Sequence, residues 1–376
     1  MTIKILHTAD LHLGMRFASR GYTPQLQESL SKARFETLDT LIKVANKQQS
    51  DLLVIAGDLF DSPRVSRGDI LRAATLLKDF EGRLILILPG NHDYIQKSDD
   101  PIWPNFLNNV SQNTILLSEP KPYDLGLHGL DLTVYPAPCT SKHSKTNVVG
   151  WVPEYIKDKK ACLTVGIAHG SMEGLSPDFN QDYYPMSKTE LQTAGVDLWL
   201  MGHTHIRYPD EEEGTQARIF FPSTPEPDGL DCRHPGYVWS IEIAENKSVH
   251  YHSIQTGSYR FFDLERQLKN EADIERIKIE FRGMNAEKHL VKLRLKGRIH
   301  NELYDERESL LDELEKSVLY LTSDTSELFR EITPKDIDQE FTSGSFPHRL
   351  LTALAKKHPD PLLLQTAYDL IQEARK

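Results

Sequence analysis

Five short clusters of polar residues in this sequence each follow directly after a run of apolar residues. Together they offer carboxylate, imidazole and amide groups, which bind metal ions and transfer protons. In chain order the clusters hold Asp10 and His12, Asp58 and Asp61, Asn91 with His92 and Asp93, His169, and finally His203 and His205. A single Gly-Asp or Gly-Asn-His segment is ordinary turn chemistry, but the same arrangement repeated five times favours one shared site.

The positions of the clusters predict that they converge. Ligands of open α/β sheets bind beyond the carboxyl ends of the strands, and each cluster begins where a predicted strand stops. We therefore expect all five at one edge of the sheet. The spacing of two between Asp10 and His12, and between His203 and His205, places both members of each pair on the same side of an extended segment.

The types of side chain restrict the metal that such a site would bind. Imidazole and carboxylate predominate, with one amide and no thiolate, a set that suits Mn²⁺, Fe²⁺ or Zn²⁺. Seven ligands are too many for one open ion, but they fit two ions that share a bridging carboxylate. Two ions about 3.5–4 Å apart are the usual clamp for in-line attack on phosphorus. The clusters therefore predict phosphoester hydrolysis at a dinuclear site.

The length and composition allow a large core. The chain has 376 residues, of which 39% are hydrophobic, enough for one α/β domain of about 200–250 residues and a smaller one. Its three cysteines, Cys139, Cys162 and Cys232, lie far apart, which argues against a disulfide framework and a CxxC-type zinc site. No signal peptide and no run of about 18 apolar residues is present. We therefore expect a cytoplasmic protein without a membrane segment.

The net charge of −11 argues at first against a nucleic-acid partner, because phosphate backbones select basic surfaces. A site built from carboxylates is acidic until its ions bind, however, and the ions are then the largest local charges. Net charge therefore decides little here. Four arginines lie near the clusters and would be the candidate contacts if the substrate were DNA: Arg16, Arg64, Arg67 and Arg207.

Up to about residue 255 the sequence alternates short apolar runs with amphipathic stretches. Buried strands are predicted at 3–6, 51–58, 84–88, 163–169 and 197–203, with further strands at 218–223 and 236–243. Helical spacing of apolar residues predicts helices over 26–47 and 67–80. Residues 134–160, rich in Pro, Lys and Ser, are predicted to form a loop. Strands that alternate with helices indicate a layered α/β domain.

After about residue 260 the pattern changes. Residues 274–281 and 290–299 alternate apolar with charged residues, as half-buried strands do, and residues 302–321 are strongly helical. These elements predict a small α+β domain. Apolar residues on both sides of Pro359 and Pro361, between residues 346 and 371, predict two short helices around a proline break.

The set of motifs resembles a known family. D-x-H (10–12), G-D-x-x-D (57–61), G-N-H-D (90–93), His169 and G-H-x-H (202–205) are similar to the signature of the calcineurin-like metallophosphoesterases, over about the first 220 residues. The segments ILHTADLHLG and GDLFD resemble the DNA-repair nuclease branch, which includes the SbcD component of the bacterial SbcCD complex. The later region resembles the capping domain of these nucleases through its layout and residues 290–299.

The resemblance implies a fold and a domain organisation. The fold would be α/β, a layered β-sandwich flanked by helices, with a small α+β capping domain and a C-terminal helical segment. The expected boundaries are 1–260 for the catalytic domain, 270–340 for the cap and 345–376 for the helical segment.

The resemblance also implies a role for each motif residue. One ion would be held by Asp10, His12, Asp58 and His205, and the other by Asp58, Asn91, His169 and His203. Mn²⁺ is the usual metal of the family. His92 would stabilise the transition state and protonate the leaving oxygen, and Asp93 would orient its imidazole.

Two details bear on the branch. Asp61 stands where the eukaryotic-type nucleases generally have histidine, and the bacterial SbcD proteins have aspartate there. This favours the bacterial branch. Within residues 224–237 the glutamate typical of the family is not clearly placed.

The function implied is a manganese-dependent DNA exonuclease or endonuclease. It would act as the nuclease partner of an SMC-type ATPase (SbcC-like) in DNA repair, with residues 346–371 as the docking segment, and family members commonly form homodimers. The apolar face of 346–371 equally fits packing on its own domain. Two alternatives stay open: a small-molecule or nucleotide phosphodiesterase or phosphatase of the same superfamily, and a scaffold with a vestigial site.

Overall fold

The computed structural model describes residues 2–95, 102–156, 163–210, 217–357 and 361–374. Contacts between residues divide the chain into two compact units, Met1–Tyr259 and Arg260–Lys376. Among the described residues, no helix is both long and apolar enough to cross a bilayer. Cys139 and Cys232 are buried free thiols, and Cys162 lies outside the described residues.

Two six-stranded sheets form the framework of the first unit. The order of the first sheet is β12-β11-β1-β2-β3-β4, and that of the second is β5-β6-β7-β8-β10-β9. The strands of the first sheet, in chain order, are β1 (Thr2–Thr8), β2 (Leu52–Ala56), β3 (Leu84–Leu88), β4 (Thr114–Leu116), β11 (Tyr237–Ala244) and β12 (Val249–Gln255). The strands of the second are β5 (Tyr123–Asp124), β6 (Leu132–Ala137), β7 (Leu163–His169), β8 (Leu198–Gly202), β9 (Arg207–Tyr208) and β10 (Ile219–Pro222).

Parallel strands occupy the middle of both sheets. β1 to β4 are parallel, as are β6, β7, β8 and β10, whereas β11, β12, β5 and β9 pair antiparallel at the edges. Because parallel strands point the same way, the carboxyl ends of each set lie together. This arrangement gathers the segments that follow the strands.

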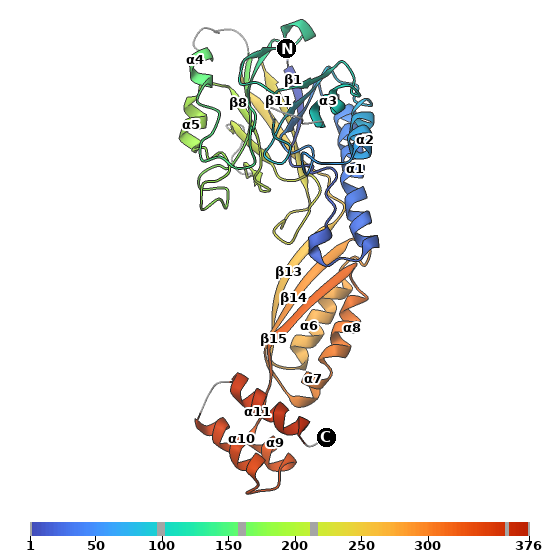
Figure 1. Ribbon diagram of the computed structural model, residues 1–376, viewed down its shortest axis with the longest axis vertical. Helices are drawn as coiled ribbons and strands as arrows, with labels where there is room; N and C mark the ends of the chain where they lie inside the picture. Colours follow the sequence, from blue (N-terminus) through green and yellow to red (C-terminus); the bar gives the residue numbers. More distant parts are fainter. Residues whose placement is uncertain (1, 96–101, 157–162, 211–216, 358–360, 375–376) are drawn as a thin grey trace. The chain divides into compact units, whose positions relative to one another are not determined.

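Helices cover the outer faces of both sheets (Figure 1). The first sheet packs under α1 (Pro24–Lys47), α2 (Arg67–Leu77) and α3 (Ile102–Leu107), and the second under α4 (Val152–Ile156) and α5 (Lys188–Thr193). The two sheets bury a third apolar cluster between them, to which Val54 and Leu86 contribute from one sheet and Val165 and Leu200 from the other. The predicted layered α/β fold is therefore confirmed.

The starts of the two long helices follow from local sequence. Thr23 and Ser66 are in extended conformation, and their hydroxyls accept hydrogen bonds from the amides of Leu26 and Asp69 at the starts of α1 and α2. Such N-caps satisfy backbone donors that have no partner within the helix. Two short 3₁₀ helices, Ala18–Arg20 and Gly126–His128, complete the first unit.

The prediction of a loop over 134–160 is wrong at two places. Residues 134–137 belong to the buried strand β6, and residues 152–156 form α4. Pro136 is the source of the error, since proline has no amide to donate to a ladder and usually argues against a central strand. Residues 157–160 of the predicted loop lie outside the described residues.

The second unit contains a three-stranded parallel sheet in the order β13-β14-β15. Its strands are β13 (Arg260–Leu268), β14 (His289–Ile299) and β15 (Tyr320–Arg330). The helices α6 (Glu271–Arg282), α7 (Asn301–Asp305) and α8 (Arg307–Glu315) connect them, and a cluster of buried apolar residues joins these helices to the sheet.

The predicted strand over 274–281 is wrong, because these residues lie within helix α6. Ile274, Ile277 and Phe281 are its buried residues, and this spacing of three and four is helical. Ile279, which the alternating pattern treats as apolar and inward, is exposed. The prediction of a helix over 302–321 holds only as far as residue 315, since Tyr320 begins strand β15.

Three helices close the chain: α9 (Pro334–Glu340), α10 (Phe346–Lys357) and α11 (Pro361–Glu373). The last two correspond to the helices predicted around the proline break, and Pro359 itself lies outside the described residues. Ile337, Phe341, Leu351 and Tyr368 form their common core.

Candidate active site

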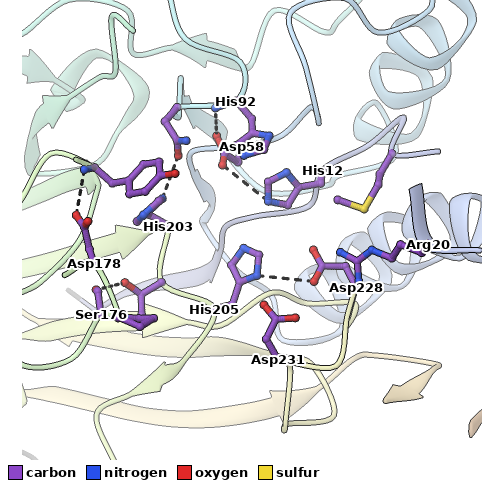
Figure 2. Close-up of a pocket in the computed structure, with 15 residues that line it drawn as sticks. His12, Arg20, Asp58, His92, Ser176, Asp178, His203, His205, Asp228 and Asp231 are labelled. Atoms are coloured by element: carbon purple, nitrogen blue, oxygen red, sulfur yellow. Dashed lines mark hydrogen bonds and ion pairs between the residues drawn. The ribbon is translucent and has the colours of Figure 1, made fainter. Parts of the chain in front are cut away.

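The five polar clusters meet where strands of both sheets end. Asp10 and His12 follow β1, Asp58 follows β2, Asn91 follows β3, His169 ends β7, and His203 and His205 follow β8. The expectation of one sheet edge is corrected by this arrangement, because four of these residues come from the first sheet and three from the second. Figure 2 shows His12, Asp58, His203 and His205 around a common space.

The backbone at these positions is not extended. The φ angles of Asp10, His12, Asp58 and His203 are 56°, 46°, 53° and 89°, all in the left-handed region that residues with a side chain rarely adopt. Asp10 and His12 do lie on the same side, as predicted, but the predicted cause, an extended segment, is wrong. Tight left-handed bends bring the side chains together, and such strain concentrates at functional sites.

Two glycines make room for the buried side chains. A Cβ atom on Gly57 would lie 2.0 Å from Nδ1 of His169, and one on Gly90 would lie 2.2 Å from Oδ1 of Asp58. Neither distance leaves space for a methyl group. The glycines of the G-D and G-N-H motifs are thus required by packing against candidate ligands.

Asp58 lies at the centre of the site. Its Oδ2 is 3.3 Å from Nε2 of His169 and 3.8 Å from Nε2 of His12, while its Oδ1 accepts a hydrogen bond from the amide of His92 at 2.8 Å. Burial alone would raise the pKa of this carboxyl, but the surrounding imidazoles of His169, His12 and His92 together outweigh burial and hold the pKa well below its usual range. His12 and His169 thus face the same carboxylate oxygen. Asp58 is therefore placed to bridge two metal ions.

Asp10, His12 and His205 form the first group. Asp10 and His205 are close, with Nε2 of His205 3.8 Å from Oδ1 of Asp10, and the ligand atoms of all three residues lie within 4.8 Å of one another. Both ring nitrogens of His12 are buried without a hydrogen-bond partner among the described residues, and burial lowers its pKa well below the usual value. A buried neutral imidazole with no partner is costly and fits a metal ligand.

Asn91, His169 and His203 form the second group, next to Asp58. The side-chain oxygen of Asn91 is 2.9 Å from Nε2 of His169 and 3.0 Å from Nδ1 of His203. Nδ1 of His169 lies 2.9 Å from the carbonyl oxygen of Ala56, a contact that fixes the ring and turns Nε2 toward Asp58. Burial disfavours the charged ring of His169, but the Asp58 carboxylate raises its pKa to about 9.

His92 adjoins Asn91 but is held differently. Its Nδ1 is 2.9 Å from the main-chain carbonyl of Asp61, so this nitrogen is the donor and Nε2 is the atom left for chemistry. The ring is partly exposed, packs edge-on against His12 at 4.6 Å and borders the cavity. This geometry suits a group that meets substrate.

The contacts of Asp93 differ from its predicted role. Its carboxylate oxygens accept hydrogen bonds from the amides of Gly90 at 2.7 Å and Phe60 at 3.0 Å, and the contact to the His92 ring comes instead from Asp61. Burial, together with the charge of Asp58, raises the pKa of Asp93 to about 8. Asp93 therefore ties the loops after β2 and β3 together and positions His92 only indirectly.

The groups border a cavity of about 370 Å³. Besides six of the cluster residues, its lining comes from other segments of the first unit. These additional residues are Met15, Arg20, Ser176, Pro177, Asp178, Tyr183, Thr204, Asp228 and Asp231. Ser176, Asp178, Asp228 and Asp231 are visible at its border in Figure 2.

Asp228 is a site residue that the sequence patterns did not reveal. It is buried, and its Oδ1 lies 3.8 Å from Nδ1 of His205. Arg34 and the Cys232 thiol donate hydrogen bonds to the same carboxylate at 3.4 Å and 3.2 Å. No apolar run directly precedes Asp228, so the pattern that marks the other clusters is missing. The only signal is an acidic, cysteine-containing segment within residues 224–237.

The position of Asp228 leads to a prediction. Replacing it with asparagine keeps the shape but removes the charge that orients His205. If His205 binds one of two ions, as the motifs predict, the affinity of that site for Mn²⁺ should fall roughly 10- to 100-fold. Isothermal titration with Mn²⁺ measures both sites. Asp231→Asn is the matched control, since it removes the same charge from the exposed part of the same cavity wall. Equal losses in both variants would contradict the orienting role.

The four arginines proposed to contact DNA differ in their surroundings. Arg64 and Arg67 are exposed, and Arg16 forms an exposed ion pair with Asp69. Arg207 donates a hydrogen bond to the Ser253 hydroxyl at 2.8 Å, and its guanidinium lies 4.5 Å from the ring centre of Tyr237. Arg207 therefore serves contacts within the protein rather than contact with DNA.

Comparison with known proteins shows that the part of the chain with the five polar clusters matches one family. The model of the calcineurin-like phosphoesterase family matches residues 3–207. The chain is 25% identical over 213 residues to the uncharacterized metallophosphoesterase YhaO of Bacillus subtilis, covering 54% of this chain and 49% of that protein.

Two further relatives carry more specific names. The chain is 28% identical over 239 residues to the DNA double-strand break repair protein Mre11 of Methanopyrus kandleri, covering 60% of this chain and 49% of that protein. It is 34% identical over 94 residues to the SbcD component of the SbcCD nuclease of Bacillus subtilis, covering 24% of this chain and 22% of that protein. The chain thus spans about half the length or less of these relatives.

Proposed function

The chain belongs to the calcineurin-like phosphoesterase family, and we propose that it is a metal-dependent nuclease that hydrolyses phosphodiester bonds in DNA. One observation carries the proposal. Oδ2 of Asp58 lies 3.3 Å from Nε2 of His169 and 3.8 Å from Nε2 of His12. His92 borders the same cavity and is held through Nδ1, which leaves Nε2 available. This combination would provide two ion sites and a separate acid at one place.

The donor set fits two divalent ions. Asp10, His12, Asp58 and His205 would hold one, and Asp58, Asn91, His169 and His203 the other. Bound there, the ions would lower the pKa of a water molecule to make a nucleophile and would neutralise charge on the phosphate. We propose Mn²⁺ as the metal, because oxygen and imidazole ligands suit it and because it is the usual metal of the calcineurin-like phosphoesterases.

The residues of the chain supply the remaining steps. His92, protonated on Nε2, would donate that proton to the leaving oxygen, and the carbonyl of Asp61 keeps Nδ1–H oriented throughout. Asp93 holds the loop that carries His92 through the amides of Gly90 and Phe60. The left-handed bends at Asp10 and Asp58 fix both carboxylates before substrate arrives.

DNA as the substrate rests on the relatives, one of which is a DNA double-strand break repair protein and another a component of a nuclease. The exposed Arg64 and Arg67 are the two proposed contacts that remain available for phosphates at the surface. Their removal should therefore weaken DNA binding and leave hydrolysis of a small ester intact.

We also propose that the C-terminal helices dock on an SMC-type ATPase. Phe346, Leu362, Leu363 and Leu370 expose apolar side chains on α10 and α11, whereas Leu351 and Tyr368 pack within the helical cluster. The exposed set fits an apolar partner groove.

We propose the cytoplasm as the compartment of the protein. Cys139 and Cys232 are buried free thiols, which accords with a reducing environment.

The experiment that tests the function compares three substrates. The full chain is incubated with linear duplex DNA, single-stranded DNA and bis(p-nitrophenyl) phosphate, each with Mn²⁺ and with EDTA. We expect hydrolysis of DNA and of the ester with Mn²⁺ and none with EDTA. Hydrolysis of the ester alone would favour a small-molecule phosphodiesterase, and no hydrolysis at all would favour a scaffold.

A further inference from the structure

A second cavity lies beside the catalytic one. It measures about 560 Å³ and is lined by residues between Ser171 and Pro185 together with Ile206. Ser176, Pro177 and Asp178 line both cavities. A group attached to a phosphate in the catalytic cavity would therefore reach the second cavity across this shared wall.

The loop that forms the second cavity is firmly fastened. Asp178 accepts hydrogen bonds from the Ser171 hydroxyl at 2.9 Å and from the amides of Asp182 and Tyr183 at 3.1 Å and 3.0 Å. The Ser171 amide donates to the carbonyl of Tyr183 at 2.8 Å, and the hydroxyls of Ser176 and Thr204 bond to each other. These hydrogen bonds give the loop a defined conformation.

This fastened loop presents an aromatic ring to solvent. Phe179 is 95% exposed, and Ile206, also in the lining, is 40% exposed. Single exposed apolar residues are common on proteins, but these two line the same cavity and so offer one apolar surface beside the catalytic site. On the catalytic side of the shared wall, the Tyr183 ring lies 4.8 Å from the ring of His203, so each of the two cavities has an aromatic side chain in its lining.

The lining indicates the chemistry of the ligand. Its apolar part consists of Met172, Leu175, Pro177, Phe179, Pro185 and Ile206. Glu173 and Asp178 are the charged residues, and the described lining contains no lysine or arginine. Carboxylates repel phosphate, and apolar and aromatic surfaces favour a flat, uncharged ring. In a polynucleotide that ring is a base.

We infer that Phe179 and this cavity form a subsite for the nucleobase next to the phosphodiester bond that is cleaved. The inference rests on the proposed function as a DNA nuclease. A base that stacks on Phe179 has to leave the base stack of a duplex, which costs free energy. The subsite therefore favours single-stranded or frayed DNA over internal duplex positions.

Steady-state kinetics of the full chain test the subsite. Phe179→Ala should raise KM for a single-stranded oligonucleotide about tenfold, the order expected for loss of one stacked base. The ratio of kcat/KM for the oligonucleotide to that for bis(p-nitrophenyl) phosphate should fall by the same factor. Phe179→Tyr keeps an aromatic face and should restore the ratio. Leu127→Ala is the matched control, since Leu127 is 99% exposed and lines neither cavity.

A binding measurement gives a second readout. In a His92→Gln background, in which cleavage should be slow compared with binding, an oligonucleotide with 2-aminopurine beside the reacting phosphate should lose fluorescence on binding, and Phe179→Ala should abolish that loss. If the chain cleaves DNA and Phe179→Ala changes neither KM nor quenching, the subsite is wrong and the nuclease function stands. If the wild-type chain hydrolyses only the ester, the nuclease function fails and the subsite fails with it.

Discussion

Replacing His92 with glutamine is expected to lower kcat for DNA cleavage roughly 10²- to 10⁴-fold while both metal ions stay bound. The side chain is held through Nδ1 by the carbonyl of Asp61. The hydrogen bond from His92 to Asp58 comes from the main-chain amide, which the substitution preserves. Kinetics on an oligonucleotide measure the loss of turnover, and elemental analysis of the purified variant measures the Mn²⁺ content.

Two comparisons make this prediction specific. If His92 protonates the leaving oxygen, its loss should matter far less for bis(p-nitrophenyl) phosphate, because p-nitrophenolate leaves without needing a proton. The neighbouring Asn91→Ala variant should instead lose metal, since the Asn91 oxygen lies between His169 and His203. A His92→Gln protein that has lost an ion would show that His92 is a ligand.

Replacing Asp58 with asparagine should weaken the binding of both ions together. One carboxylate oxygen faces His169 and His12, which belong to different donor groups. Removing its charge should therefore lower both Mn²⁺ affinities by more than the roughly 10- to 100-fold that loss of an outer partner costs. Isothermal titration measures the two affinities, and hydrolysis should fall to background at Mn²⁺ concentrations that saturate the wild type.

Asp61→Asn is the matched variant for Asp58. Asp61 lies three residues further along the same loop, and its Oδ1 is 3.7 Å from Nδ1 of His12. It should therefore weaken only the ion held by His12. Two ions bound at wild-type affinity to the Asp58→Asn protein would contradict the bridging role.

The overall fold and the meeting of the clusters were readable from sequence because each signal is local. An apolar run that stops at Asp58 or His169 marks both a buried strand and the position of its end. Parallel pairing brings together the ends of strands within one sheet. The meeting of Asp58 with His169 also requires the packing of two separate sheets, which the local signals do not indicate. The resulting family assignment is confirmed by the match over residues 3–207.

Other features depend on contacts between distant parts of the chain. Asp228 reaches His205 through a segment with no apolar run before it, and Asp93 is turned toward Gly90 and Phe60 by packing. Helix α6 shows an ambiguity of pattern instead. Its apolar residues alternate over a short stretch, and only burial of Phe281 but not Ile279 distinguishes helix from strand.

The division of the donors between two sheets has a thermodynamic consequence. Asp10, His12, Asp58 and Asn91 follow strands of one sheet, whereas His169, His203 and His205 belong to the other. Any ion bound there cross-links the two layers, and an ion that binds only the folded chain adds about 2.7 kcal/mol to the free energy of unfolding at a hundred times its Kd. If the site holds the proposed ions, the concentration of free divalent ions would therefore set the stability of the sandwich as well as its activity.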